Sequence, residues 1–289
     1  MTPLNRSVSF GQFSFGLIWL WLIILVLVPT LMVVVASVLP RGESDFVTLG
    51  FTLESYARLF DPIYARVFQN SVWLAGMTTL WCLVIGYPFA YMLAQAPKRW
   101  RNLLLLLVII PFWTSSLIRA YAMVIILKTN GLLNSFLLAT GLIEEPLKLL
   151  FTDLAVIIGL VYSLLPFMIL PLYASIEKLD LRLLEAGRDL GAGRLTLFRR
   201  IILPLTMPGI IAGGTLVFLP ALGMFYMADL LGGAKVLLLG NLIKNQFLAA
   251  RDWPFGAAIS VILLIAMALL LLIYVYAGRR AAQKTDVIL

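Results

Sequence analysis

Two ionisable side chains, Arg119 and Asp229, lie inside long apolar segments of the sequence. A charge near the centre of a bilayer costs at least about 2.5–3.5 kcal/mol on insertion scales, so such residues usually pair with one another or serve a function. One interpretation is that the two pair, or reach toward the membrane surface, and so lock a helix bundle. In the other, Asp229 with Tyr226 and Phe225 presents an anionic, aromatic surface to a cation, and a carboxylate such as Asp153 neutralises Arg119.

A second polar cluster follows Pro111, where Trp113, Ser115 and Ser116 interrupt an apolar segment. A proline leaves a backbone carbonyl without its helical partner, and broken helices with exposed polar groups near the membrane centre often line a translocation path. Close packing of helices through small residues explains the serines equally well. The sequence leaves both interpretations open.

Several kinds of chemistry are excluded by the residues that the sequence lacks. It contains no histidine, which excludes histidine-based catalysis and histidine metal sites within this chain. Its one cysteine, Cys82, lies in an apolar segment and has no partner for an intrachain disulfide. A phosphate-binding loop of the G-x-x-x-x-G-K-S/T type is also absent. We therefore expect a chain that is not an enzyme and holds no cofactor or metal of its own.

The longest charged run, residues 177–208, contains two short amphipathic patterns. The first places apolar or small residues at helical spacing, at Leu179, Leu183, Ala186, Gly187 and Leu190. Gly191 and Gly193 then interrupt the pattern as a helix end and turn would. The second short helix is expected to carry Leu195, Phe198, Ile202 and Leu205 on one side. Neither helix is long enough to cross a bilayer, so the pair is predicted to lie on its surface or to dock into another protein.

This segment resembles the EAA signature of ABC-importer permeases, in which E-A-A is followed by a glycine and then by I-x-L-P at fixed spacings. The matching residues are Glu185, Ala186, Gly187, Gly191, Ile201, Leu203 and Pro204. Gly187 is the one departure, because the family usually has alanine there. In that family the segment is a cytoplasmic coupling loop that docks into a groove on the ATPase subunit. The resemblance implies that these residues transmit ATPase closure; otherwise Glu185 only pairs with the arginines one helical turn away.

The composition predicts an integral membrane protein. Hydrophobic residues make up 62% of the chain and charged residues 12%, which is more apolar surface than a soluble domain of this length could cover. The first apolar stretch is too long and unbroken for a signal peptide and is expected to remain as a helix. A core domain is expected over 66–278. The predicted spans are 16–39, 69–96, 102–127, 153–174, 207–231 and 255–278, with the coupling loop at 175–206.

The distribution of charge predicts the orientation. Basic residues outnumber acidic ones on the side of the two tails, 1–15 and 279–289, and of the coupling loop, whereas the two kinds balance on the opposite side. The positive-inside rule therefore places both termini and the coupling loop in the cytoplasm. The formal net charge of +8 is thus explained by topology, and no nucleic-acid partner is expected.

Beyond the signature itself, longer stretches of the chain resemble the polyamine permeases of spermidine/putrescine ABC importers. The stretches that carry this resemblance are 111–122, 159–180, 203–213 and 227–258, and it extends over roughly 20–278. It implies an all-α integral membrane protein of the bacterial inner membrane, with six transmembrane helices, the type I ABC importer permease (MetI-like) fold and a cytoplasmic coupling helix.

The resemblance also implies the partners and the activity. The partners are a second related permease, two ATPase subunits that bind ATP and Mg²⁺, a periplasmic polyamine-binding protein and the surrounding membrane lipid. The binding protein delivers spermidine or putrescine, and the membrane helices translocate it by alternating access. The alternatives are an ABC permease for another small solute and an ion-coupled secondary transporter. The sequence does not distinguish spermidine from putrescine.

Overall fold

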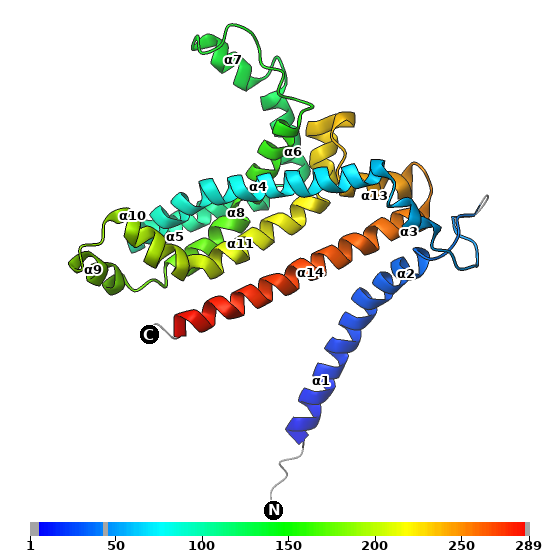
Figure 1. The fold of residues 1–289 in the computed structure, drawn as a ribbon, viewed down its shortest axis with the longest axis horizontal. Helices are drawn as coiled ribbons and strands as arrows, with labels where there is room; N and C mark the ends of the chain where they lie inside the picture. The colour runs from blue at the N-terminus through cyan, green and yellow to red at the C-terminus, as the bar shows by residue number, and fades with distance from the viewer. Residues whose placement is uncertain (1–5, 43–45, 287–289) are drawn as a thin grey trace, which may run out of the picture. The chain divides into compact units, whose positions relative to one another are not determined.

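The computed structural model describes residues 6–42 and 46–286, and all regular elements within those ranges are helices (Figure 1). The outermost parts of the expected tails, 1–5 and 287–289, lie outside the described residues. The chain forms two compact units. One comprises the residues up to 64 together with 243–265, and the other comprises 65–242 together with the residues from 266 onward.

The prediction of six membrane-crossing helices is confirmed for the described part of the chain. Six helices there are long and apolar enough to cross a bilayer. They are Ser14–Ala36, Pro62–Gln95, Ser116–Ala139, Asp153–Ile176, Arg194–Gly223 and Trp253–Tyr276. The last of these belongs to a longer helix, α14 (Trp253–Asp286).

The first unit begins with one continuous helical rod. Its helices α1 (Arg6–Leu22) and α2 (Val28–Ala36) are joined by the π-helical turn η1 (Ile23–Leu27). Most of the described side chains of this rod are exposed, as expected for a helix that contacts lipid. At its end, the buried Ser37 hydroxyl lies 2.7 Å from the Tyr56 hydroxyl of the short helix α3 (Glu54–Arg58), which fixes the connecting segment.

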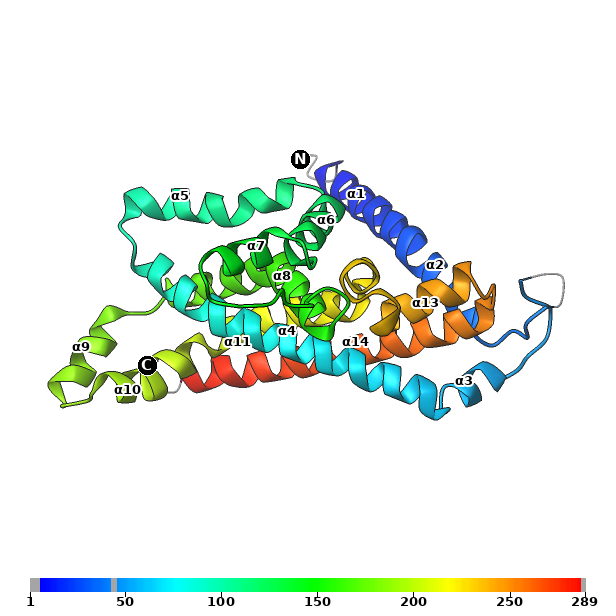
Figure 2. The same ribbon diagram turned by 90° about the horizontal axis from the view of Figure 1, so that it is seen from above.

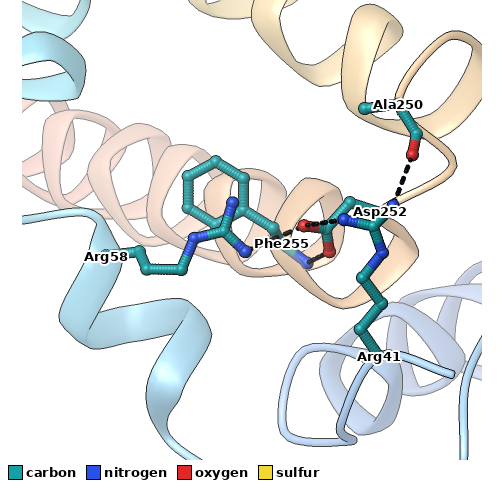
Figure 3. A network of polar contacts seen from close by, with 5 residues as sticks. All are labelled: Arg41, Arg58, Ala250, Asp252 and Phe255. Atoms are coloured by element: carbon teal, nitrogen blue, oxygen red, sulfur yellow. Dashed lines mark hydrogen bonds and ion pairs between the residues drawn. The ribbon is translucent and has the colours of Figure 1, made fainter. Parts of the chain in front are cut away.

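A buried carboxylate joins this connecting segment to the start of α14, within the first unit (Figure 3). Asp252 is 2% exposed and accepts hydrogen bonds from Arg58 Nη1 at 2.8 Å and from the backbone N–H of Phe255 at 3.2 Å. Arg41 Nη1 lies 3.6 Å from the same carboxylate. The Arg58 guanidinium also lies 4.2 Å from the centre of the Phe255 ring. Asp252 therefore caps α14 and neutralises the positive charges of the connecting segment that follows α2.

The core of the second unit is formed by α4 (Pro62–Gln95), α8 (Asp153–Ile176) and α11 (Leu203–Gly223), which run side by side in both views (Figures 1 and 2). Small residues allow α8 and α11 to approach closely. A Cβ added at Gly213 would lie 2.7 Å from Met168 Sδ, and one added at Gly209 would lie 2.5 Å from Ser175 Oγ. These glycines serve helix packing, as small residues do between membrane helices.

The third predicted span, 102–127, is not one helix. It is divided into α5 (Lys98–Ile109), a 3₁₀ turn η2 (Ile110–Trp113) and α6 (Ser116–Leu127). Pro111 cannot donate the hydrogen bond that would continue α5, and the backbone at Thr114 is extended between the two helices. The short helix α7 (Leu132–Ala139) follows α6 and packs against it.

The fifth predicted span, 207–231, differs at both ends. The helix already begins at Arg194, where α10 (Arg194–Leu197) and the π-helical turn η3 (Phe198–Ile202) lead into α11 without a break. The second short amphipathic helix is therefore the first part of a membrane helix. A π turn just before Pro204 is physically reasonable, because proline disrupts the regular bonding of the preceding turn.

At its other end α11 stops at Gly223, and Met224 has a non-helical conformation. Two short pieces follow, α12 (Phe225–Met227) and the π-helical turn η4 (Ala228–Gly232). The short turn η5 (Gly233–Lys235) and helix α13 (Leu239–Leu248) complete the connection toward α14. Asp229 thus lies beyond a helix break rather than inside a continuous span.

Candidate functional site

We call the expected coupling loop, residues 175–206, the docking segment. It contains one well-formed helix, α9 (Leu181–Asp189), with a defined cap at each end. Asp180 precedes it, and its carboxylate accepts a hydrogen bond from the backbone N–H of Arg182 at 2.9 Å. At the other end, Gly191 has φ +79° and donates to the Arg188 carbonyl at 2.8 Å. The next N–H, that of Ala192, donates to the Gly187 carbonyl at 3.0 Å. Together these bonds form a Schellman motif, so the signature glycine ends the helix.

Replacing Gly191 with serine is expected to weaken this helix end by about 1–2 kcal/mol, since residues with a side chain disfavour the left-handed conformation. Amide hydrogen exchange over 181–192 should become roughly 10-fold faster, which is the factor that about 1.4 kcal/mol implies. The matched change, Gly193→Ser, should leave exchange unaltered. Gly193 has φ −68° and caps α10, a position that serine favours. Equal effects of the two changes would contradict the assignment of Gly191 as the residue that ends α9.

Within the segment, α9 packs against the start of the long helix that follows it. A Cβ on Gly187 would lie 2.6 Å from Leu197 Cδ2 and 3.0 Å from Ile201 Cδ1. The structure thus brings together two signature positions, Gly187 and Ile201. The residue that departs from the family pattern is the one at the closest approach of the two helices. The atoms it meets are the ends of flexible side chains, so an alanine could be accommodated by their movement.

The predicted apolar stripe of α9 is only partly buried. Leu184 and Gly187 face inward, whereas Leu183, Ala186 and Leu190 are exposed. The side chain of Leu190 is 88% exposed, and Leu195 is exposed in the neighbouring helix. Leu183 and Leu190, which the pattern places on one stripe with Gly187, are therefore not on the buried side of α9. They lie on an exposed face with Ala186, so the segment retains apolar side chains that are free to contact another protein.

The remaining signature residues lie before and after the contact between Gly187 and Ile201. Glu185 is exposed and forms no ion pair or hydrogen bond through its side chain with any residue that the structure describes, so the predicted pairing with its neighbouring arginines is not found. Leu203 is partly buried at the start of α11, and Pro204 beside it is exposed. An exposed carboxylate without an intramolecular partner is suited to contacting a second protein.

Asp229 has a partner that the sequence interpretation missed. The side chain of Asn241, in the first turn of α13, is 2% exposed; its Nδ2 donates to the Asp229 carboxylate and, at 3.1 Å, to the Phe225 carbonyl. The rings of Phe225 and Tyr226 meet edge to face with centroids 6.1 Å apart. Asn241 thus links Asp229 to Phe225 on the broken part of the helix, where Tyr226 contacts Phe225. One signal existed in the sequence: Asn241 is the single polar side chain in the run 236–243.

Arg119 does not form the pair that one interpretation predicted. The helix that carries it, α6, packs against η4, which carries Asp229. Nevertheless, Arg119 makes no ion pair with any residue in the described ranges, neither with Asp229 nor with Asp153. Its guanidinium lies 5.6 Å from the centre of the Phe112 ring instead. The neighbouring Trp113 is 78% exposed. Ser115 is also exposed, so Trp113 and Ser115 lie at the surface of the chain beside the break before α6, whereas Nε and Nη1 of Arg119 are buried.

Comparison with known proteins assigns the chain to a family. A model of the family described as binding-protein-dependent transport system inner membrane component matches residues 86–286, more than half of the chain. The chain belongs to this family. Together with the six apolar helices of the described part, this makes it a multi-pass inner membrane protein and the membrane subunit of a transport system. The matched residues include the whole docking segment and both helix breaks.

Relatives within this family are similar along nearly the full chain. The spermidine/putrescine transport system permease protein PotB of Haemophilus influenzae is 54% identical over 278 residues, covering 96% of this chain and 97% of that protein. The protein of the same name from Escherichia coli (strain K12) is 58% identical over 266 residues, covering 92% and 97%.

Solved structures support the fold. A chain of a bacterial ABC transporter involved in the import of the acidic polysaccharide alginate superposes with a TM-score of 0.73 at 18% identity. The alignment covers 96% of this chain and 98% of that one. The family member described here therefore has the type I ABC importer permease fold, as the sequence predicted.

Proposed function

We propose that this chain is the permease subunit of an ATP-driven ABC importer that carries polyamines, spermidine or putrescine, across the inner membrane. The observation that carries the proposal is its identity of 54–58% with two permeases named for spermidine/putrescine transport, over more than nine-tenths of the chain. The docking segment and the broken helices support the same reading. Transport would proceed by alternating access, since broken membrane helices often form sites that open to either side in turn.

The partners follow from this proposal. The exposed apolar face of α9 and the unpaired Glu185 provide a contact for an ATPase subunit, and two such subunits would bind and hydrolyse ATP with Mg²⁺. A second related permease would complete the membrane assembly, and a periplasmic binding protein would deliver the polyamine. Both termini and the docking segment would then lie in the cytoplasm, as the excess of basic residues on that side supports.

The residues that we assign to this activity are of two kinds. Coupling to the ATPase is assigned to Glu185, Ala186, Gly187, Gly191, Ile201, Leu203 and Pro204. The substrate path is assigned to Asp229, Tyr226, Phe225, Trp113, Ser115, Ser116 and Arg119. The carboxylate and aromatic rings of the second group suit a cation, and Asn241 bonds to both the Asp229 carboxylate and the Phe225 carbonyl.

The substrate is tested by ATP hydrolysis of the complex reconstituted with its binding protein. Spermidine or putrescine should stimulate hydrolysis at least about 10-fold over sulfate or an amino acid at equal concentration, a difference of about 1.4 kcal/mol in effective recognition. Sulfate is an informative control, because a sulfate permease is 26% identical to this chain. Stimulation by another solute alone would keep the importer and remove the polyamine assignment. ATP hydrolysis that no solute stimulates would remove both the importer assignment and the polyamine assignment.

A further inference from the structure

A cavity of about 630 Å³ lies within the second unit, beside the docking segment. Its floor includes Tyr87 of α4 together with Phe198 and Ile202 of η3, and its rim includes Gln95, Arg188 and Arg194. This volume is within the range of small-molecule sites, about 300–1,000 Å³. None of the residues assigned above to coupling or to the substrate path lines it.

The floor of the cavity is apolar and fixed in position. The Tyr87 ring meets the Phe198 ring edge to face, with centroids 5.6 Å apart. The Tyr87 hydroxyl is 2.9 Å from the Thr206 hydroxyl, which connects α4 to α11. The ring can therefore present its apolar surface to a ligand while its one polar group is already satisfied.

The rim of the cavity is cationic. Arg188 and Arg194 are exposed, and neither forms an ion pair with a residue in the ranges that the structure describes. No carboxylate lines the cavity. An apolar floor below two guanidinium groups is complementary to an amphiphile with an anionic head, because guanidinium groups bind phosphate oxygens in pairs of parallel hydrogen bonds.

The cavity lies on a different face of α9 from the one that we assign to the ATPase. Leu184 and Arg188, four residues apart, line the cavity. Leu183 and Leu190 are exposed and do not line it. Residues that line the cavity and residues left for protein contact thus occupy separate stripes of one helix. A partner protein seated on Leu183 and Leu190 would leave the cavity for a smaller ligand.

We propose that this cavity binds an anionic phospholipid of the cytoplasmic leaflet, with its phosphate held by Arg188 and Arg194 and its apolar part on the aromatic floor. The proposed topology places this end of α4 at the headgroup level of that leaflet, where anionic lipids attract basic residues. Because the walls come from both a membrane helix and the docking helix, the bound lipid joins the two elements through which coupling must pass. The inference rests on the topology and not on the identity of the transported solute.

Native mass spectrometry tests the proposal on the complex extracted with its partner subunits and placed in nanodiscs of phosphatidylcholine and phosphatidylglycerol. The double variant Arg188→Gln/Arg194→Gln should retain phosphatidylglycerol roughly 30-fold less well, as two basic residues worth about 1 kcal/mol each imply. The matched control is Arg199→Gln/Arg200→Gln. These two arginines are exposed nearby but do not line the cavity, so retention should be unchanged.

A milder variant keeps the test independent of folding. Gln95→Glu changes one exposed rim residue to a carboxylate of the same size, and it should weaken retention in the same direction. Equal retention by the arginine double variant and its control would overturn the proposal. Full displacement of the lipid by inorganic phosphate would also overturn it, since the site would then hold a free anion. The proposal would likewise be overturned if the arginine double variant lost the ATPase subunit but retained the lipid, because the two arginines would then contact the ATPase and not the lipid. All measurements are made without solute, so failure of the polyamine assignment would not affect them.

Discussion

Replacing Arg58 with methionine is expected to lower the free energy of unfolding by about 2–3 kcal/mol, the largest effect that we predict for a change outside the docking segment. The reason is that Asp252, with 2% of its side chain exposed, would lose the bond of 2.8 Å that neutralises it. Leaving one charge of a buried pair without its partner costs about 3–5 kcal/mol. We take a value below that range because the side chain of Arg58 is itself 40% exposed.

The ionisation of Arg58 supports the same assignment. Burial lowers the pKa of its guanidinium, but hydrogen bonds and charge interactions with Asp252 and then Tyr64 together more than reverse that effect, so the pKa is raised above its ordinary value. A raised pKa contributes stability that is fully present below the pKa of the unfolded state and is lost only as the pH rises through the higher pKa of the folded state. The contribution of Arg58 should therefore be constant between pH 6 and pH 9, roughly the range in which these proteins are handled.

The measurement is unfolding in mixed micelles of increasing sodium dodecyl sulfate, followed by tryptophan fluorescence. Trp253 is a suitable reporter because it stacks on Phe46 in the same unit, with ring centroids 4.7 Å apart. Arg41→Met is the matched control. Its guanidinium is 3.6 Å from the carboxylate and its side chain is 55% exposed, so the loss should stay below about 1 kcal/mol. Equal losses for the two arginines would refute the assignment.

What the sequence predicted well depends on local patterns. The six apolar segments are visible because a membrane helix needs about 20 apolar residues in succession. The end of the docking helix is visible because Gly191 must adopt a positive φ, a requirement that is tied to one residue type. The signature residues Gly187 and Ile201 lie at fixed spacing and prove to be close in space.

What it predicted poorly depends on contacts between distant residues. Nothing local to Arg58 identifies Asp252 as its partner, because 194 residues separate them. Asn241 was passed over for the same reason, since its importance comes from reaching Asp229 and Phe225 across a loop. The sequence pattern did not show which of Leu183 and Leu184 is buried, because both are equally apolar and only the position of the next helix decides. Periodicity gives the faces of a helix but not their neighbours.

Replacing Glu185 with lysine is expected to uncouple ATP hydrolysis from transport while the chain remains folded and inserted. The side chain is exposed and forms no ion pair or hydrogen bond with a described residue, so its reversal should alter stability by no more than about 0.5 kcal/mol. At an interface with an ATPase, however, the reversed charge would face groups that suit a carboxylate, and such a mismatch costs several kcal/mol of binding free energy. Solute-stimulated hydrolysis by the reconstituted complex should fall at least about 10-fold, whereas unfolding in mixed micelles should be unchanged.

The same helix offers a matched control at Asp189, one turn further on, which is exposed and outside the signature. Asp189→Lys makes the same change in charge at the C-terminal end of α9, where a cation is favoured by the helix dipole. It should keep most of the stimulation. Comparable losses for both changes would mean that the segment responds to its net charge rather than to contact at Glu185. Normal coupling in Glu185→Lys, with the ATPase still bound, would remove this carboxylate from the coupling surface and leave the exposed leucines Leu183 and Leu190 as the contact to be tested next.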